Sequence, residues 1–288
     1  MKKLWWLTIT LVLILAALFI STAMAEEAPT EYTSGNYRYT LHPDGTAMII
    51  RYTGWRESAL SIPGALDGHT VTAIGDSAFK YCNLESITIP HSVTSIGNGA
   101  FSSCKSLRSI TIPDSVTSIG NYAFSSCKSL QSITIPDSVT DMGSNPFSSC
   151  EKLTHITLSS NHPAFAIIDG VLFHKPTKTL ISYPYAYNQT SYTIPNGITT
   201  IGNGAFRSCE SLTSVAIPHS VTSIGNYAFS SCKSLRSITI PDSVTSIGDG
   251  AFGLCKSLAS ITILNSVASI GNRAFSSCES LTNITIPG

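Results

Sequence analysis

The 288-residue sequence is poor in charge: only 12% of its residues are Asp, Glu, Lys or Arg, and 17 basic residues balance 17 acidic ones. It has no basic patch, which argues against nucleic acid and anionic membranes as partners. It also lacks a Cys-x-x-Cys pair, a Gly-x-Ser-x-Gly elbow and a Gly-rich phosphate loop. Zinc binding, thioredoxin-like chemistry, hydrolase nucleophiles and nucleotide binding are therefore unsupported. With no candidate catalytic residue, metal ligand or cofactor site, the sequence predicts a protein that is not an enzyme.

One long hydrophobic run is present, and it lies at the N-terminus. A basic start is followed by an uncharged apolar run from Leu4 to Ile20, and then by Ala23-Met24-Ala25, which has the form of a cleavage site. This pattern predicts a signal peptide over residues 1–25, cleaved after Ala25, and a secreted or cell-surface protein with no membrane attachment afterwards. The alternative is an uncleaved anchor, because the run approaches the length of a spanning helix. Cleavage would remove two lysines and leave 15 basic against 17 acidic residues.

A repeat of 23 residues occupies most of the remaining chain. A clear copy is Ser220–Asp242, SVTSIGNYAFSSCKSLRSITIPD, and the unit can be written LxxIxIPxxVxxIGxxAFxxCxx. Its cysteines are Cys82, Cys104, Cys127, Cys150, Cys209, Cys232, Cys255 and Cys278. Self-similarity at such a period indicates stacked units rather than one globular core.

Each unit is expected to form one coil of a solenoid. Leu235-x-x-Ile238-x-Ile240 has the LxxLxL form of a leucine-rich-repeat strand, and isoleucines two residues apart point to the same face. Pro241 ends this strand because it has no N–H to donate, and Gly225 permits the turn on the far side. The sequence therefore predicts a β-rich leucine-rich-repeat solenoid of 23-residue units, with short turns or 3-10 arcs, in a right-handed coil stack.

At nearly every apolar position these units resemble the BspA-like leucine-rich repeats, and the resemblance covers about residues 36–288. Members of that family are secreted or cell-surface adhesion and binding proteins of host-associated bacteria and some anaerobic protists. The resemblance thus implies an exported adhesion protein. It carries over no catalytic residue, because none belongs to the repeat motif.

The regions on either side of the regular repeats are expected to differ from them. Residues 26–61 are predicted to form a linker and a β-hairpin cap, with Glu26–Ser34 disordered and the hairpin at Tyr37–Thr53. Such a cap would cover the first coil, since terminal repeats need protection. Regular repeats are expected over residues 62–158 and 194–288.

Residues 159–193 interrupt the spacing and are predicted to form an irregular hairpin insertion. An Asp169-Gly170 turn lies between two apolar runs, and Thr179–Tyr183 is expected to add a further strand. Aromatic side chains are favoured anchors in interfaces. The insertion therefore supplies candidate ligand-binding residues, which are Phe165, Phe173, His174, Tyr183, Tyr185 and Tyr187. The alternative is that these side chains pack the hairpin onto the coils.

A second candidate surface is formed by the outward positions of the strands. Ser and Thr alternate with the buried residues, so stacking would align them in two parallel files of hydroxyl groups. The candidate ligand-binding residues here are Thr111, Thr134, Thr239 and Thr262. Such a surface suits weak, multivalent binding of glycan or protein. The alternative is a solvated β face, in which threonine is common for its strand preference.

One cysteine per coil predicts a column of inward-facing thiols. An exported chain permits disulfides, but parallel Cβ vectors on stacked strands hold the Cβ atoms too far apart for good disulfide geometry. Buried free thiols acting as small hydrophobic groups are therefore favoured. Disulfides between adjacent coils remain the alternative.

Two functions follow from the sequence. The first is an exported binding or adhesion protein that engages an extracellular protein or glycan without catalysis. The alternative is a structural or self-assembling repeat scaffold with no dedicated ligand. In that case the last coil, which has no recognisable cap, would pair with another chain, as exposed strand edges tend to do. The association state of the protein distinguishes the two.

Overall fold

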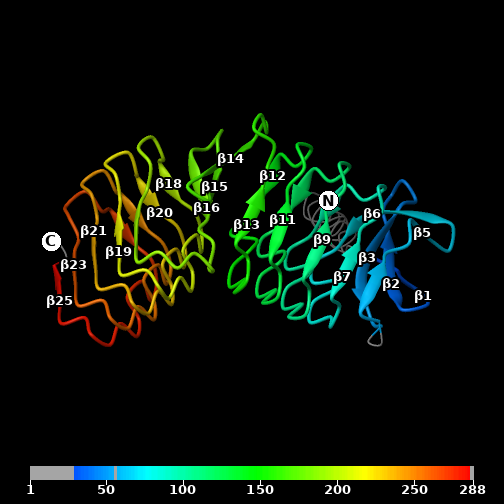
Figure 1. Cartoon of the computed structure of the whole chain (residues 1–288), viewed down its shortest axis with the longest axis horizontal. Coiled ribbons are helices and arrows are strands. Elements are labelled where there is room, and N and C mark those ends of the chain that lie inside the picture. Colours follow the sequence, from blue (N-terminus) through cyan, green and yellow to red (C-terminus); the bar gives the residue numbers. More distant parts are fainter. Residues whose placement is uncertain (1–28, 55–56, 286–288) are drawn as a thin grey trace, which may run out of the picture. The chain divides into compact units, whose positions relative to one another are not determined.

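Each repeat unit forms one coil that contains two short strands. The computed structural model describes residues 29–54 and 57–285, which form a β-solenoid of about ten turns with a spacing of about 23 residues (Figure 1). Within three separate sheets, the first strand of a coil pairs in parallel with that of the next, so that Ile238 lies beside Ile261. These strands are β4 (Ala59–Ser61), β7 (Ser86–Thr88), β9 (Ser109–Thr111), β11 (Ser132–Thr134), β13 (His155–Thr157), β17 (Ser191–Thr193), β19 (Ser214–Ala216), β21 (Ser237–Thr239), β23 (Ser260–Thr262) and β25 (Asn283–Thr285).

The second strand lies on the far side of the coil, where the sequence pattern predicted only a turn. Its members are β6 (His69–Ile74), β8 (Ser95–Ile96), β10 (Ser118–Ile119), β12 (Asp141–Met142), β18 (Thr200–Ile201), β20 (Ser223–Ile224), β22 (Ser246–Ile247) and β24 (Ser269–Ile270). A glycine directly follows each of them. At Gly120 an added Cβ would stand 2.6 Å from the backbone nitrogen of Asn98 in the preceding coil. Glycine is therefore required for the coils to stack this closely.

A ladder of Asn and Asp side chains joins the coils beside these glycines. The Oδ1 atom of Asn98 accepts a hydrogen bond from the N–H of Asn121 at 2.8 Å, and Asn121 in turn accepts one from Ser144 at 2.7 Å. In the later coils Asn226 accepts from the N–H of Asp249 at 2.8 Å. The ladder supplies partners for backbone donors just beyond the strands. The sequence interpretation did not anticipate it.

The interior is filled by columns of equivalent side chains. Phe206, Phe229 and Phe252 are buried and stack with ring centroids 4.9 and 5.2 Å apart. The thiol of Cys232 donates to the carbonyl oxygen of Phe206 at 3.0 Å, and all eight cysteines are free. The arc that carries them consists of turns, which corrects the alternative of 3-10 arcs. Ser231 has φ of 62°, and a left-handed residue cannot continue a 3-10 helix.

The N-terminal cap contains one strand more than predicted. The expected hairpin is formed by β2 (Tyr37–Leu41) and β3 (Ala47–Tyr52), and β3 pairs in parallel with β6 of the first coil. The expectation of disorder was wrong for β1 (Glu31–Ser34), which pairs with β2. Ser34 and Tyr39 donate hydrogen bonds of 2.7 and 2.9 Å to the carboxylate of Asp67. Asp67 lies in the turn between β5 (Ala65–Leu66) and β6, so this contact anchors β1 to the first coil.

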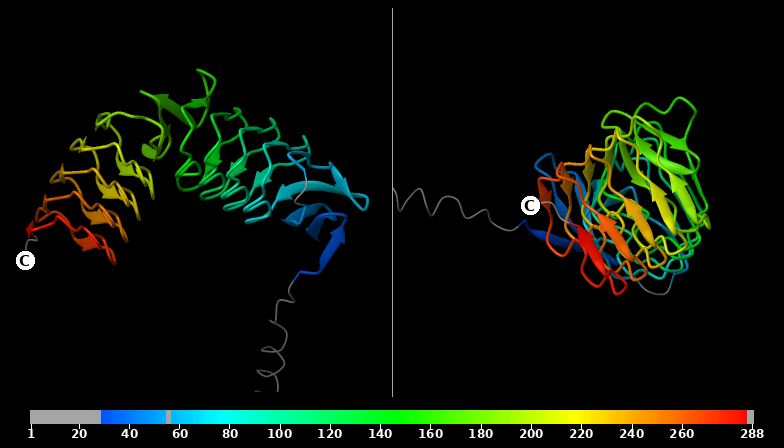
Figure 2. Two further views of the ribbon diagram at one scale, coloured as in Figure 1. Left: turned by 60° about the horizontal axis from the view of Figure 1, so that its bottom comes forward. Right: turned by 90° about the vertical axis from the view of Figure 1, so that its left-hand side faces the viewer.

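The coil stack is interrupted by β14 (Phe165–Ile168), β15 (Val171–His174) and β16 (Thr179–Ser182). The first two form an antiparallel hairpin, and β16 continues the second-strand sheet in parallel with β18. No sheet of the described residues crosses the interruption. The sheets of the earlier coils end at β12 and β13, and those of the later coils begin at β14 and β17. Figure 2 shows these strands between an earlier and a later stack of coils.

Two further expectations concern export. The predicted signal peptide and its cleavage site at Ala25 lie outside the described residues. Within the described part of the chain, no helix is long and apolar enough to cross a membrane.

Candidate ligand-binding site at the junction of the two coil stacks

The threonines singled out from the sequence are all exposed on the first-strand sheets. Thr111 and Thr134 lie on β9 and β11 of the earlier stack, whereas Thr239 and Thr262 lie in register on β21 and β23 of the later stack. The strands that carry them belong to three sheets, because strand pairing is interrupted between β9 and β11 and again between β13 and β17. The hydroxyl files are therefore not one continuous sheet face, and each coil repeats the same chemistry.

Most of the aromatic candidates from the insertion are core residues. Phe165 and Phe173 are each 1% exposed and Tyr183 is 3% exposed. Tyr183 takes the phenylalanine position of its coil and packs on Phe206 with centroids 5.2 Å apart. The packing interpretation fits these three residues, because a ligand at the surface would not reach their rings.

The insertion is buried on both sides because it separates two hydrophobic cores. Along β15, Leu172 packs into the core of the earlier coils, whereas its neighbours Val171 and Phe173 pack into the core of the later coils. The same alternation occurs on β16, where Ile181 and Leu180 face opposite cores. The hairpin is thus a partition between the two stacks.

His174 and Tyr187 have local structural contacts. The Nδ1 atom of His174 lies 2.7 Å from Oγ1 of Thr177. Tyr187 is half-buried, packs edge-on against Tyr183, and covers Gly170 so closely that an added Cβ there would lie 3.0 Å from its ring. Tyr187 therefore holds the turn of the hairpin against the later stack.

Tyr185 differs from the other aromatic candidates because it is half-exposed and borders an open cleft. This junction cleft has a volume of about 660 Å³ and receives side chains from the last earlier coils, from the insertion and from the first regular later coil. Its lining residues are Gln131, Glu151, Lys152, Thr154, Tyr185, Ala186, Asn188, Glu210 and Ser211. Apart from Tyr185 and Ala186, all of them carry polar or charged side chains.

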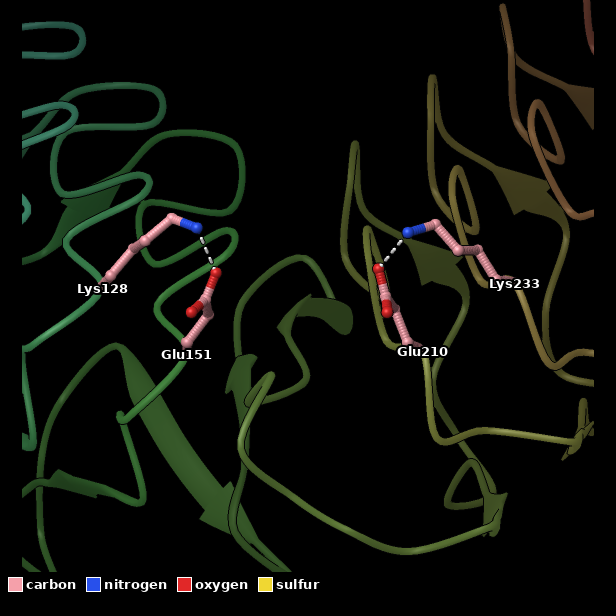
Figure 3. Close-up of polar contacts among 4 residues, drawn as sticks. All are labelled: Lys128, Glu151, Glu210 and Lys233. Atoms are coloured by element: carbon pink, nitrogen blue, oxygen red, sulfur yellow. Dashed lines mark hydrogen bonds and ion pairs between the residues drawn. The ribbon is translucent and has the colours of Figure 1, made fainter.

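Two ion pairs flank the junction cleft as near mirror images. Lys128 Nζ lies 2.5 Å from Glu151 Oε1, and Lys233 Nζ lies 2.6 Å from Glu210 Oε1. Figure 3 shows the two glutamates on the inner side of the junction and the two lysines behind them. Each of the four directly follows the cysteine of its own repeat unit. The insertion thus brings two equivalent repeat positions to face each other.

The electrostatic environment of Tyr185 is set by both ion pairs. Burial raises the pKa of Tyr185, the carboxylates of Glu210 and Glu151 raise it further, and the two lysines oppose them. The hydrogen bond from Lys128 to Glu151 also raises the pKa of that lysine. The phenol therefore remains neutral near pH 7 and lies within electrostatic reach of both walls.

On another side of the junction the two stacks are in direct contact. The buried side chain of Asn145 donates from Nδ2 to the carbonyl oxygen of Gly204 and accepts a 2.7 Å hydrogen bond from Ser182. Close by, Asn203 donates to Ser144 at 3.3 Å. These contacts fix the spacing of the coils that form the cleft.

The described residues hold no cluster of three His, Cys, Asp or Glu side chains that could bind a metal. Seven of the eight repeat cysteines are buried and Cys278 is half-buried. Burial raises the pKa of the Cys150 and Cys255 thiols to about 12. Such thiols stay protonated and are poor nucleophiles. The cleft carboxylates are paired with lysines, so the arrangement is suited to hydrogen bonding rather than to a chemical step.

Sequence analysis named Tyr185 as a candidate but did not name Glu151 or Glu210. One signal was available in the residue that follows the cysteine of each repeat unit. This residue is Lys105 or Lys128 in earlier coils, and it is a glutamate in the coils on both sides of the interruption. Nothing in one sequence showed that these two residues would face each other.

A sequence model of the BspA type leucine rich repeat region matches residues 72–175 and 181–288 in six copies. No curated protein sequence matches the chain. Among solved structures, a leucine-rich repeat protein from Eubacterium ventriosum is 27% identical, covers 90% of this chain and 85% of its own, and has a TM-score of 0.67. The pneumococcal vaccine antigen PcpA, at 20% identity, 89% and 87% coverage and a TM-score of 0.67, shares the fold. A leucine rich cell surface protein from Faecalibacterium prausnitzii is 31% identical, covers 92% and 96%, and has a TM-score of 0.45.

Proposed function

We propose, from the premise that this chain belongs to the family of BspA-type leucine-rich-repeat proteins, that it is an exported binding or adhesion protein for an extracellular protein or glycan. Proteins of this family are generally surface and binding proteins. Binding requires a surface held in a fixed shape, and stacked coils supply one because each coil is braced by its neighbours.

The observation that carries the proposal is the junction cleft. The regular coils expose nearly the same side chains again and again, which favours weak and unselective contacts. At the junction, side chains from three separate parts of the chain converge on one half-exposed concavity. A concave site with a few oriented polar groups is the usual form of a ligand site.

The proposal excludes a catalytic role. The two carboxylates of the junction cleft, Glu151 and Glu210, are held in ion pairs with lysines, with Nζ to Oε1 distances of 2.5 and 2.6 Å. Seven of the eight thiols are buried, and that of Cys278 is half-buried. Neither arrangement resembles an activated nucleophile beside a general base.

Export is part of the proposal and has a direct test. Expression in a bacterial host with an intact secretion system, followed by mass spectrometry of the released protein, should give an N-terminus at Glu26. A product that keeps residues 1–25 and fractionates with membranes would contradict cleavage after Ala25.

The binding function can be tested on an array of extracellular-matrix proteins and glycans. The purified protein is compared with a Glu151→Gln/Glu210→Gln double variant and with Thr239→Lys on the hydroxyl file. The matched control is Glu279→Gln, since Glu279 forms the same kind of pair with Lys256, at 2.8 Å, away from the cleft.

Loss of a ligand in the double variant alone would support the junction cleft, and loss in Thr239→Lys alone would move binding to the hydroxyl file. Light scattering accompanies the array. Absence of any ligand, together with concentration-dependent oligomers, would contradict the proposal and favour the self-assembling scaffold.

A further inference from the structure

The lining of the junction cleft restricts the chemistry of its ligand. Its polar groups are amides from Gln131 and Asn188, hydroxyls from Thr154 and Ser211, and charged groups. Protein interfaces are usually anchored by aromatic or aliphatic side chains in desolvated pockets. A cleft lined mostly by polar and charged residues lacks such a pocket, and it offers little to a lipid chain or to the apolar face of a helix.

The charge of the cleft is nearly balanced, which disfavours a highly charged ligand. Three lysines, Lys128, Lys152 and Lys233, stand at or directly behind its walls together with Glu151 and Glu210. A polyanion would be repelled by the inward carboxylates, and a polycation by the lysines. A ligand with many polar groups and no net charge fits this arrangement.

The two ion pairs present donors and acceptors in matched positions. In each glutamate, Oε1 receives the lysine ammonium, and within the described residues Oε2 takes part in neither pair. A carboxylate oxygen held in this way can accept a charge-assisted hydrogen bond, and an ammonium group has further protons to donate. Neighbouring hydroxyl groups both donate and accept, so a vicinal diol would satisfy one such pair.

The ring of Tyr185 supplies a complementary apolar surface. Its half-exposed ring borders the same cleft, and both carboxylates act on its phenol. The face of an aromatic ring is electronegative. The C–H groups on one face of a sugar ring are weakly positive and would pack on it while the sugar hydroxyls reach the cleft walls.

We propose that the junction cleft binds a neutral glycan, with Tyr185 as the stacking platform and Glu151 and Glu210 as hydroxyl acceptors. This inference rests on the proposed binding function and names its ligand class. The volume of about 660 Å³ is within the range of about 300–1,000 Å³ of small-molecule sites. It is room for a short oligosaccharide and not for a folded domain.

The test uses the full chain on three panels: neutral polysaccharides such as mannans, galactans and glucans; sialylated and sulfated glycans; and extracellular-matrix proteins. Variants are Tyr185→Ala, Tyr185→Phe and Glu151→Gln/Glu210→Gln. The controls are Glu279→Gln and Tyr81→Ala, since Tyr81 is a well-exposed tyrosine of another coil. Saturation-transfer NMR identifies which sugar protons contact the protein.

A neutral glycan should bind, with at least a tenfold loss of affinity in Tyr185→Ala and in the double glutamine variant. Tyr185→Phe keeps the ring and should keep most of the binding, which also guards against a merely unfolded Tyr185→Ala protein. Both controls should bind as wild type. The interaction should change little between 50 and 500 mM salt, because a neutral ligand releases no counterions.

Other outcomes would overturn the inference in separable ways. Binding only to charged glycans or only to proteins would refute the ligand class and leave the proposed function standing. Neutral-glycan binding that survives Tyr185→Ala would refute the site. No binding on any panel would refute the inference and the proposed function together.

Discussion

Replacement of Asn145 by alanine should weaken the junction between the two coil stacks. The Asn145 side chain is 2% exposed and bonds to Gly204 in the later stack and to Ser182 in the insertion. Gly204 and Ser182 are themselves buried. Removing the amide would leave one acceptor and one donor without partners, and each costs about 1–3 kcal/mol. The expected loss in the free energy of unfolding is therefore about 2–6 kcal/mol.

The matched control is Asn121→Ala in the exposed ladder. Asn121 also makes two inter-coil bonds, to Asn98 and to the N–H of Ser144. Water can replace these bonds, so the cost should be about 1 kcal/mol. Asn145→Gly serves as a second variant, because Asn145 has φ of 21° and glycine tolerates that conformation where alanine is strained.

The assay is urea unfolding followed by far-UV circular dichroism. Each stack has its own hydrophobic core, and stability in repeat proteins depends on nearest-neighbour interfaces. Weakening this one interface should therefore broaden the transition and lower its midpoint. If Asn145→Ala and Asn145→Gly cost no more than Asn121→Ala, the junction is not held by this amide and the reasoning fails.

Three further predictions concern the regular coils. Phe229→Ala should lower the free energy of unfolding, measured with urea, by about 3–5 kcal/mol. Phe275→Ala should lower it clearly less, because Phe275 is half-buried. Equal losses in the two variants would contradict the stacking argument. Gly248→Ala should lower the free energy of unfolding by about 1–3 kcal/mol, since its Cβ would meet the backbone nitrogen of Asn226 at 2.5 Å. A neutral effect would show that the coils can shift apart. Burial raises the pKa of Cys255 to about 12 from an ordinary value of 9.0. Above pH 9 the unfolded thiol loses its proton while the folded one keeps it, so the free energy of unfolding should fall as pH rises. Disulfide reagents should label this thiol at pH 8 only after denaturation, and rapid labelling of the native protein would disprove its burial.

The insertion shows how far sequence patterns reach. The turn at Asp169-Gly170 and the strand at Thr179–Ser182 were predictable because turn chemistry and apolar runs are local signals. The consecutive apolar residues Val171, Leu172 and Phe173 also indicate a strand buried on both faces, but they do not indicate which core covers each face. That depends on the neighbouring coils, which is why Phe173 is a core residue whereas Tyr185, in the same aromatic set, borders a cleft.

The sequence alone determined the coil. A 23-residue period puts the same residue type at the same place in each turn, so burial of Ile238, Phe229 and Cys232 follows from the pattern. Only the tertiary structure decided the site. Glu151 and Glu210 are 59 residues apart in the sequence, and both line the same cleft. They face each other because the insertion takes the place that a regular coil would occupy between the two stacks. The repeat period predicts which side chains each coil buries. A break in the stack exposes side chains that the next coil would otherwise cover, and their arrangement depends on the tertiary structure.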